Sequence, residues 1–277
     1  MKKIVPLIGG EEVCNLSSEI NKIASKNIKQ DDVLICSYPR SGNTWVRLLL
    51  TSYLLYDQGY EFKGANPIHP DRIIPDLHLH SWSDVDDGIR IPAKIAKTHS
   101  VLASLFTRRI IYIARQPVDS LVSYYHFHRR YAERYQKVKY FNVDEFSIVM
   151  WRGWAQHVLS FLNHSRSNDD FFITYELLHR ENDLTLRSML SFLNIDINDE
   201  AVKKAVENNK FSMLKKIEND NSKTGRFING EKFFRKGRIG GGREELSQET
   251  LDQIDAWSEE IYLEILARQK ESLLRVH

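Results

Sequence analysis

The sequence predicts a three-layer α/β fold in which helices flank a central parallel sheet. Short apolar runs at residues 33–38, 109–114 and 170–176 have the length and composition of buried strands. Helical apolar spacing follows each run, and strands that alternate with helices favour a parallel sheet covered on both faces. Ligands of such sheets bind beyond the carboxyl ends of the strands, so we expect a functional site there.

The other elements follow in chain order. Residues 95–99 form a short strand, and a helix begins at Pro117, where proline is tolerated in the first turn. Further helices are expected from apolar spacing at residues 11–27, 45–56, 142–163, 183–193, 199–208 and 247–270. Residues 57–92 and 218–242 are rich in turn-forming or charged residues and are expected to be irregular. Because no repeat or internal linker interrupts the pattern, we expect one domain over residues 1–277.

The composition excludes several classes of protein. The chain is 42% hydrophobic and 27% charged, as in ordinary globular proteins, and its net charge of +2 is too small to indicate nucleic-acid binding. Cys14 and Cys36 are too few for a disulfide framework and indicate a reducing compartment. No apolar stretch approaches the roughly 18 residues of a membrane span, and no secretory pattern begins the chain. We therefore expect a cytoplasmic protein without nucleic-acid or membrane partners.

The stretch from Ser37 to Trp45 has the chemistry of an anion site. It joins a strand pattern to a helix pattern, and backbone N–H groups at a helix amino-terminus lack intrahelical partners. Gly42 permits close approach of the backbone to a ligand, and Arg40 supplies a positive charge. Neutral donors come from Ser41, Asn43 and Thr44. The stretch predicts a phosphate or sulfate site, with an ordinary capped strand-to-helix turn as the alternative. The nucleoside-triphosphate pattern G-x-x-x-x-G-K-[ST] is absent.

Four motifs strengthen this interpretation. They are, in chain order, YPRSGNTW at residues 38–45, KTH at 97–99, RQPVDSLVSYYHF at 115–127 and FFRKG at 233–237. They resemble Y-P-K-S-G-T-T-W, K-T-H, R-N-P-x-D-x-x-V-S-Y-Y-x-F and F-x-R-K-G of the cytosolic-type sulfotransferases. The first motif departs from the family by Arg40 in place of lysine and by Asn43 in place of threonine. The resemblance spans most of the chain and implies a P-loop-like α/β fold.

The resemblance also implies a donor. This is 3′-phosphoadenosine 5′-phosphosulfate (PAPS), whose product is 3′-phosphoadenosine 5′-phosphate (PAP). PAPS carries two separate anionic ends, so two cationic sites are needed. The residues implied for the 5′-phosphosulfate are Arg40, Ser41, Gly42, Asn43 and Thr44. Those implied for the 3′-phosphate are Arg115, Ser123, Arg235, Lys236 and Gly237, and those for adenine are Trp45, Tyr175 and Phe211. For Trp45 and Tyr175, a packed core aromatic is the alternative.

The implied reaction is an in-line transfer of the sulfuryl group to an acceptor hydroxyl or amine, and it requires no metal. His99 accepts the proton of the acceptor, a role that suits the near-neutral pKa of imidazole, and Arg40 stabilises the departing phosphate oxygen. Lys97 holds the sulfonate. In the family, the lysine at the position of Arg40 is thought to move between a serine and the bridging oxygen, and Ser123 matches that serine. A hydrogen-bonded strand-end histidine is the alternative for His99.

Other functions stay open at this point. One is a P-loop-like small-molecule kinase, disfavoured by the missing G-K-[ST], and another is a nucleotide-binding module without turnover. The small-molecule acceptor is not defined, although several aromatic and histidine residues are candidates to line its pocket, namely Tyr53, Phe62, His78, His80, Trp82, Phe127, Tyr131 and Tyr140. The family's dimer motif, K-x-x-x-T-V-x-x-x-E, does not recur after Arg243, which leaves the oligomeric state open, with a homodimer as one alternative.

Overall fold

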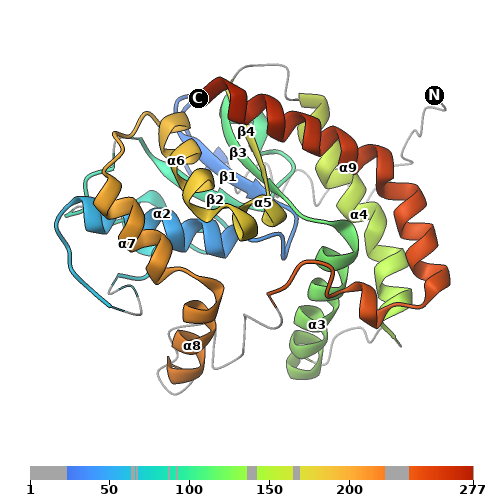
Figure 1. Ribbon diagram of the computed structural model, residues 1–277. Coiled ribbons are helices and arrows are strands. Elements are labelled where there is room, and N and C mark those ends of the chain that lie inside the picture. Colours follow the sequence, from blue (N-terminus) through green and yellow to red (C-terminus); the bar gives the residue numbers. More distant parts are fainter. Residues whose placement is uncertain are drawn as a thin grey trace.

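Four parallel strands form the central sheet, in the order β2-β1-β3-β4 (Figure 1). They are β1 (Val33–Ser37), β2 (Ile95–Thr98), β3 (Arg109–Ala114) and β4 (Asp170–Thr174). Every residue of β1, β2 and β4 is buried, as expected for a parallel sheet covered on both faces. The computed structural model describes residues 24–63, 66, 68–86, 88–91, 93–135, 142–164, 169–221 and 237–276. Most of the helix expected at 11–27 lies outside these residues, as do Arg235 and Lys236.

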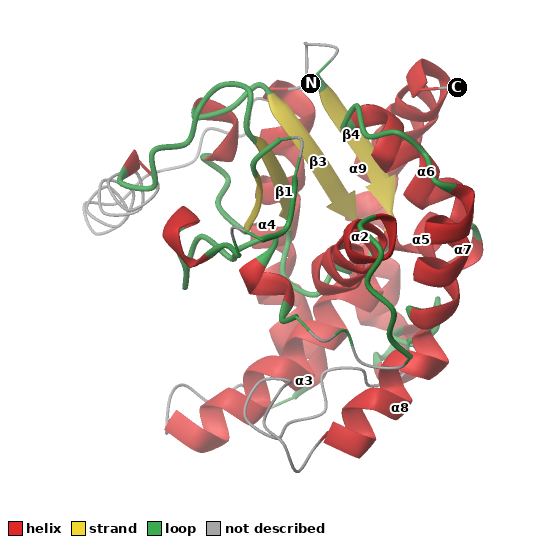
Figure 2. Ribbon diagram, turned by 90° about the vertical axis from the view of Figure 1, so that its left-hand side faces the viewer, coloured by secondary structure: helices red, strands yellow, loops and turns green. Residues whose placement is uncertain are grey.

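Helices cover both faces of the sheet, which confirms the three-layer prediction (Figure 2). Alternate residues of β1 enter different apolar clusters. Val33 and Ile35 pack with α2, α6 and α7, whereas Leu34 and Cys36 pack with α3, α4 and α9. The helices of the described chain are α2 (Asn43–Asp57), α3 (Pro117–Tyr135), α4 (Val143–His164), α5 (Tyr175–Arg180), α6 (Asn182–Phe192), α7 (Asp199–Asn208), α8 (Phe211–Asn221) and α9 (Gln248–Val276). None of them has the length and apolarity of a membrane span.

Three differences from the predicted elements have physical reasons. The apolar run at 170–176 stops being a strand at Thr174, whose side chain accepts a hydrogen bond from Leu177 N–H and so caps α5. The short helices α5 and α8 were not predicted because each follows a strand or turn without a long periodic stretch. α9 continues past the predicted end at residue 270 because it packs on β4, where Phe172 N–H donates to Ser272 Oγ at 2.9 Å.

Candidate active site

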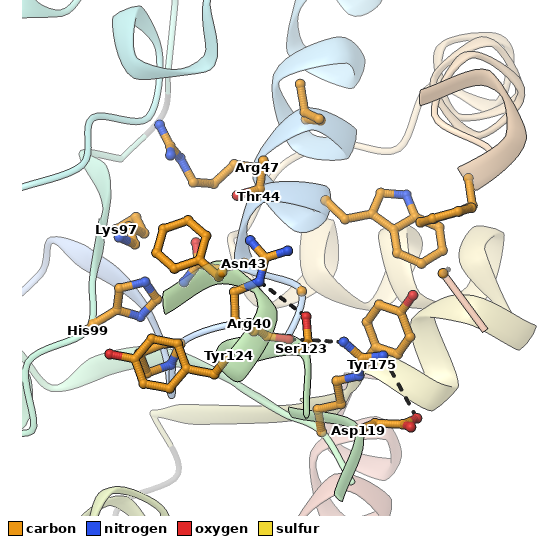
Figure 3. A pocket seen from close by; sticks show the side chains of 18 of the residues that line it. Arg40, Asn43, Thr44, Arg47, Lys97, His99, Asp119, Ser123, Tyr124 and Tyr175 are labelled. Atoms are coloured by element: carbon orange, nitrogen blue, oxygen red, sulfur yellow. Dashed lines mark hydrogen bonds and ion pairs between the residues drawn. The ribbon is translucent and has the colours of Figure 1, made fainter. Parts of the chain in front are cut away.

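A cavity of about 500 Å³ lies beyond the carboxyl ends of the strands (Figure 3). Residues that follow all four strands line it, and so does Phe211 at the start of α8. Most of the site residues predicted from the sequence meet here, namely Arg40, Gly42, Asn43, Thr44, Trp45, Lys97, His99, Arg115, Ser123, Tyr175, Phe211 and Gly237. Ser41 is not among the described residues that line the cavity, and Arg235 and Lys236 lie outside the described residues. Ligand binding at the carboxyl ends of parallel strands is the expected place for this fold.

The loop between β1 and α2 contains two residues in the left-handed conformation. The φ angle is +67° at Arg40 and +106° at Gly42. Gly42 is the N-cap of α2, and no side chain of the described residues caps the first backbone N–H groups of that helix. The turn therefore presents these N–H groups and the helix dipole at the cavity, where an anion can accept from them.

Gly42 is a position where the close approach of two segments requires glycine. An added Cβ would lie 2.9 Å from Cδ2 of Tyr175, whereas one added at Gly59, where φ is +84°, would meet nothing within 4 Å. We expect Gly59→Ala to lower the free energy of unfolding by about 1–2 kcal/mol, the cost of the left-handed conformation. Gly42→Ala should lower it by about 1–3 kcal/mol more, because the ring of Tyr175 must move. Urea denaturation of both variants measures the difference, and equal losses would contradict the contact.

Arg40 and Ser123, which both line the cavity, are joined by a hydrogen bond. Arg40 Nε–H donates to Ser123 Oγ at 3.2 Å, and the guanidinium lies 5.1 Å from the centre of the Phe127 ring. Two other predicted donors in the loop point elsewhere. The amide of Asn43 donates to Ser37 Oγ at 3.2 Å, and Ser41 Oγ lies 3.3 Å from Ser120 Oγ. The donors that the loop offers to an anion are therefore Arg40, Thr44 and the backbone.

Arg115 forms a second cationic position on the same cavity. Its guanidinium lies 4.1 Å from the centre of the Tyr175 ring, and its Nη1–H donates to Arg40 O at 3.1 Å. Arg115 Nη2 lies 3.8 Å from Asp119 Oδ2. The Asp119 carboxylate also accepts from the N–H groups of Gly240 and Gly242 at 2.8 and 2.7 Å. Arg115 Nε is buried and has no hydrogen-bond partner within the described chain. This orphaned donor fits an anionic ligand.

Three aromatic side chains form one wall of the cavity. The Trp45 ring meets the rings of Tyr175 and Phe211 edge-on, at centroid distances of 5.6 and 6.2 Å. Trp45 Nε1–H donates to Asn209 O at 2.8 Å, so the indole is held in place by the core while it lines the cavity. The Phe211 ring lies against Gly237, where an added Cβ would be 1.8 Å from Cζ. A purine can contact such an aromatic wall.

The His99 imidazole has a defined tautomer. Its Nδ1 lies 2.6 Å from Ser37 O, and because a carbonyl oxygen only accepts, Nδ1 carries the proton and Nε2 keeps a lone pair. Burial, together with the positive charge of Lys97, lowers the pKa of His99 to about 3. The imidazole that lines the cavity is therefore neutral at pH 7 and has a lone pair at Nε2, but it is a weaker base than the near-neutral pKa expected from the sequence implies.

Lys97 has a partner that the sequence analysis did not assign to it. Its Nζ donates to Asp76 Oδ2 at 2.6 Å, so the cation expected to hold a sulfonate is half of a buried ion pair. Burial lowers the pKa of Lys97, and the negative charge of Asp76 offsets part of that effect. Burial opposes ionisation of Asp76, but the charge and hydrogen bond of Lys97 outweigh it, and the pKa of Asp76 is lowered. The pairing of Asp76 with Lys97 beside β2 could not be found from spacing alone.

His157 of α4 is a second histidine behind the site. Its Nε2 lies 3.0 Å from His99 O and its Nδ1 lies 2.9 Å from the Tyr112 hydroxyl. Because His99 O only accepts, Nε2 carries the proton and Nδ1 accepts from Tyr112. Burial lowers the pKa of His157 to about 4. The sequence analysis missed His157 because it lies on the apolar stripe of a helix, where its partners from β2 and β3 are not apparent.

We expect His157→Leu to lower the free energy of unfolding by about 1–3 kcal/mol, because it leaves buried polar groups of Tyr112 and His99 without partners. In the unfolded chain His157 binds a proton near pH 6.5, whereas the folded protein binds it only near pH 4. The stability of the wild type should therefore fall as the pH is lowered through this window, and the stability of the variant should fall by a smaller amount. Urea denaturation at pH 7 and pH 5 measures both effects. Tyr112→Phe, which keeps the imidazole, is the control, and an unchanged pH dependence in His157→Leu would contradict the prediction.

Most of the described aromatic and histidine residues that were candidates to line the acceptor pocket do not line the cavity. Of its candidates only Phe127 lines the cavity. The Tyr53 hydroxyl donates to Asp196 O within the core, Phe62 stacks on Tyr56, and the Trp82 ring packs against Lys94. His78 Nε2 accepts from the backbone N–H of His99 at 3.0 Å. The side chains of Tyr131 and Tyr140 lie outside the described residues. Tyr53 is buried, and Phe62 and Trp82 pack against the core, whereas the sequence pattern does not specify which side of a loop faces the cavity.

Solved structures share the fold. Mouse sulfotransferase SULT7A1, solved in complex with PAP, superposes with a TM-score of 0.64 at 23% identity, and the match covers 93% of this chain and 92% of that one. Retinol dehydratase, solved in complex with retinol and PAP, has a TM-score of 0.62 at 20% identity, with 87% and 83% coverage. These likenesses establish the P-loop-like architecture.

Similarity in sequence establishes the family. Cytosolic sulfotransferase 12 of Arabidopsis thaliana is 28% identical over 254 residues, which are 84% of this chain and 77% of that protein. Human sulfotransferase 1C2 is 27% identical over 236 residues, 79% of each chain. The model of the sulfotransferase domain matches residues 30–268. Since this match covers most of the chain and its range includes all four sequence motifs, the protein belongs to the sulfotransferase domain family.

Proposed function

We propose that the protein transfers the sulfuryl group of PAPS to a hydroxyl or amine of a small-molecule acceptor. The observation that carries the proposal is the cavity itself, which is lined by two cationic side chains, Arg40 bonded to Ser123 and Arg115 bonded to Arg40 O, and by neutral His99 with a lone pair on Nε2. A donor with two anionic ends matches two cationic positions. Family membership supports the reaction, and the PAP bound in the mouse relative supports the donor.

The described residues fit such a donor. Arg40, Thr44 and the backbone N–H groups that follow Gly42 would hold the 5′-phosphosulfate. Arg115, whose buried Nε has no partner within the described chain, would hold the 3′-phosphate together with the backbone near Gly237. Trp45, Tyr175 and Phe211 would form the adenine wall. Ser123, which already accepts from Arg40, would connect the two anion sites. Arg235 and Lys236 stay proposed 3′-phosphate ligands outside the described residues.

The mechanism assigns one task to each side chain. PAPS supplies the sulfuryl group, and the acceptor oxygen forms a bond to sulfur as the bond from sulfur to the phosphate oxygen breaks. His99 Nε2 takes the proton of the acceptor hydroxyl, while Ser37 O keeps Nδ1–H in place. Arg40 neutralises the electron pair that leaves on the phosphate oxygen, and Ser123 orients its Nε. Lys97, also proposed at the sulfonate, would act with its charge shared with Asp76.

The competing kinase function is not favoured by the comparisons, in which the relatives are sulfotransferases.

A small-molecule acceptor is supported by retinol dehydratase, which was solved with retinol in one structure and androsterone in another. The cytoplasm is proposed as the compartment because the Arabidopsis relative is named as cytosolic. Calorimetry with nucleotides tests the donor part of the proposal most directly.

PAP should bind at least about 10²-fold more tightly than AMP, because AMP lacks the 3′-phosphate that a guanidinium can bind in a charge-assisted pair. Arg115→Gln should weaken the binding of PAP much more than that of AMP and so narrow the difference between them, while the other proposed 3′-phosphate ligands keep part of it. Arg109→Gln is the matched control, since Arg109 donates to Phe192 O and does not line the cavity. ATP that binds as tightly as PAP would contradict the proposal and favour a kinase.

A further inference from the structure

One side of the cavity carries four buried charged side chains, which we term the charged wall: Arg47, Asp71, Asp76 and Lys97. The exposed fractions are 8% and 15% for the side chains of Arg47 and Asp71, and 9% and 14% for those of Lys97 and Asp76. All four line the cavity, so they are buried by the protein and yet face its interior space.

The charged wall lies on the side of the cavity where transfer is proposed. Lys97 of β2 and His99, which follows the last residue of that strand, are two residues apart, and both line the cavity. Arg47 lies one helical turn after Asn43 and Thr44, on the same face of α2. In Figure 3 Arg47, Lys97 and His99 occupy one side of the cavity, Tyr175 and Asp119 occupy the other, and Arg40 lies between them. An acceptor at His99 would therefore meet the charged wall rather than the wall of Trp45, Tyr175 and Phe211, with the rings of Tyr124 and Phe127 also lining the cavity.

The four side chains form a connected network. Arg47 is paired with Asp71, and its Nε–H also donates to Ile74 O at 3.0 Å. Asp71 Oδ1 accepts from the backbone N–H of Asp76 at 3.3 Å, and Asp76 is paired with Lys97. The formal charges of the charged wall cancel. Asp71 Oδ2 also lies 3.2 Å from His69 Nδ1 and 3.5 Å from His80 Nε2, and Asp76 Oδ1 accepts from His78 N–H at 3.1 Å. Because a carboxylate oxygen has two lone pairs and a guanidinium has five N–H donors, such a network can still exchange hydrogen bonds with a ligand.

We infer that the acceptor is a small polyhydroxylated compound, of the chemical class of sugars and cyclitols, and not a planar phenol. This inference rests on the proposed function. An apolar ring against the charged wall would remove water from four charged groups without replacing its hydrogen bonds. Hydroxyl groups beside the sulfated one would replace them, by donating to Asp71 and Asp76 and accepting from Arg47 and Lys97. A neutral wall also matches an uncharged polyol better than a strongly charged acceptor.

The test compares cyclic alcohols that differ in their number of hydroxyl groups, and myo-inositol and cyclohexanol share the same six-carbon ring. The kcat/KM of the full chain with saturating PAPS is measured by PAP release for myo-inositol, methyl β-glucoside, cyclohexanol and 2-naphthol. We expect the polyols to exceed cyclohexanol by at least about 10²-fold, because a site built to hydrogen-bond hydroxyl groups rejects analogues that lack them. Preference for cyclohexanol or 2-naphthol, or transfer to neither polyol, would overturn the inference.

A double variant tests whether the charged wall causes the preference. Arg47→Leu combined with Asp71→Leu removes a whole ion pair and leaves the net charge unchanged, whereas either change alone would leave a buried charge unpaired. We expect kcat/KM for the polyols to fall by at least about 10-fold and that for cyclohexanol to rise. Lys204→Leu combined with Glu61→Leu, which removes an exposed ion pair away from the cavity, should change neither. A double variant with unchanged acceptor preference would overturn the inference.

Binding of PAP separates this inference from the proposed function. If the wild type discriminates PAP from AMP but prefers apolar acceptors, the inference is wrong and the proposed function stands. If PAP does not bind, the proposed function is wrong and the inference fails with it. Should the double variant itself fail to bind PAP, the ratio of polyol to cyclohexanol transfer by the wild type decides.

Discussion

His99→Ala is expected to lower kcat by about 10²–10⁴-fold, the usual contribution of a general base, while the affinity for PAP stays unchanged. The reason is geometric. Ser37 O accepts from Nδ1–H at 2.6 Å, which leaves Nε2 as the proton acceptor on the cavity, and no contact of His99 holds either cationic position. Steady-state kinetics with PAPS and calorimetry with PAP measure the two quantities separately. Retention of most of the activity would remove His99 from the mechanism.

Added imidazole provides a control for this variant. If the missing group is a base, free imidazole should restore part of the activity of His99→Ala, whereas a variant that had only lost its fold would not respond. His157→Leu, which removes a partner of the His99 backbone but keeps the His99 ring, should retain more activity than His99→Ala. Equal losses in the two variants without rescue by imidazole would indicate a structural role for His99.

The pH dependence follows from the same environment. Burial lowers the pKa of His99 to about 3 from an ordinary value of 6.5, so the neutral base persists as the pH falls below 6.5. Since kcat/KM for PAPS reports ionisations of the free protein, His99 should cause no decline of kcat/KM between pH 7 and pH 5. A decline centred near pH 6.5 that is absent from His99→Gln would contradict this assignment.

Arg40→Ala is expected to lower kcat by about 10²–10³-fold, the effect of removing one group that stabilises developing negative charge. Arg40→Lys should retain more activity because lysine keeps the charge. It should still be slower than the wild type, since the planar fork that bonds Ser123 and lies over Phe127 is lost. The variants are comparable because alanine, lysine and arginine meet the same backbone strain at a φ of +67°.

Ser123→Ala serves as the matched control for Arg40. It removes the acceptor of the Nε–H bond but keeps the guanidinium, so we expect a smaller loss of kcat than for Arg40→Ala. Rates and PAP affinities of the three variants can be measured under one set of conditions. If Arg40→Lys matched the wild type in both, the shape of the arginine would have no role in the reaction.

The sequence alone determined the fold class and the place of the site. Apolar runs and helical spacing are local properties, and they predicted β1, β3 and the strand-to-helix turn that contains Gly42. The motifs around Arg40, His99 and Arg115 each follow a strand, and parallel strands end at the same edge of a sheet. Their convergence on one cavity therefore followed from chain order.

Only the tertiary structure decided what each side chain contacts. Lys97 pairs with Asp76, 21 residues away, and His157 bonds the carbonyl of His99 from 58 residues away. Such contacts depend on how helices and loops pack on the sheet, which the period of a pattern does not specify. The same holds for the charged wall, where Arg47 of α2 meets Asp71 across a segment of irregular backbone. Local sequence thus located the strand ends where the cavity lies, and long-range packing defined the surroundings that lower the pKa of His99 and bring the charged wall together.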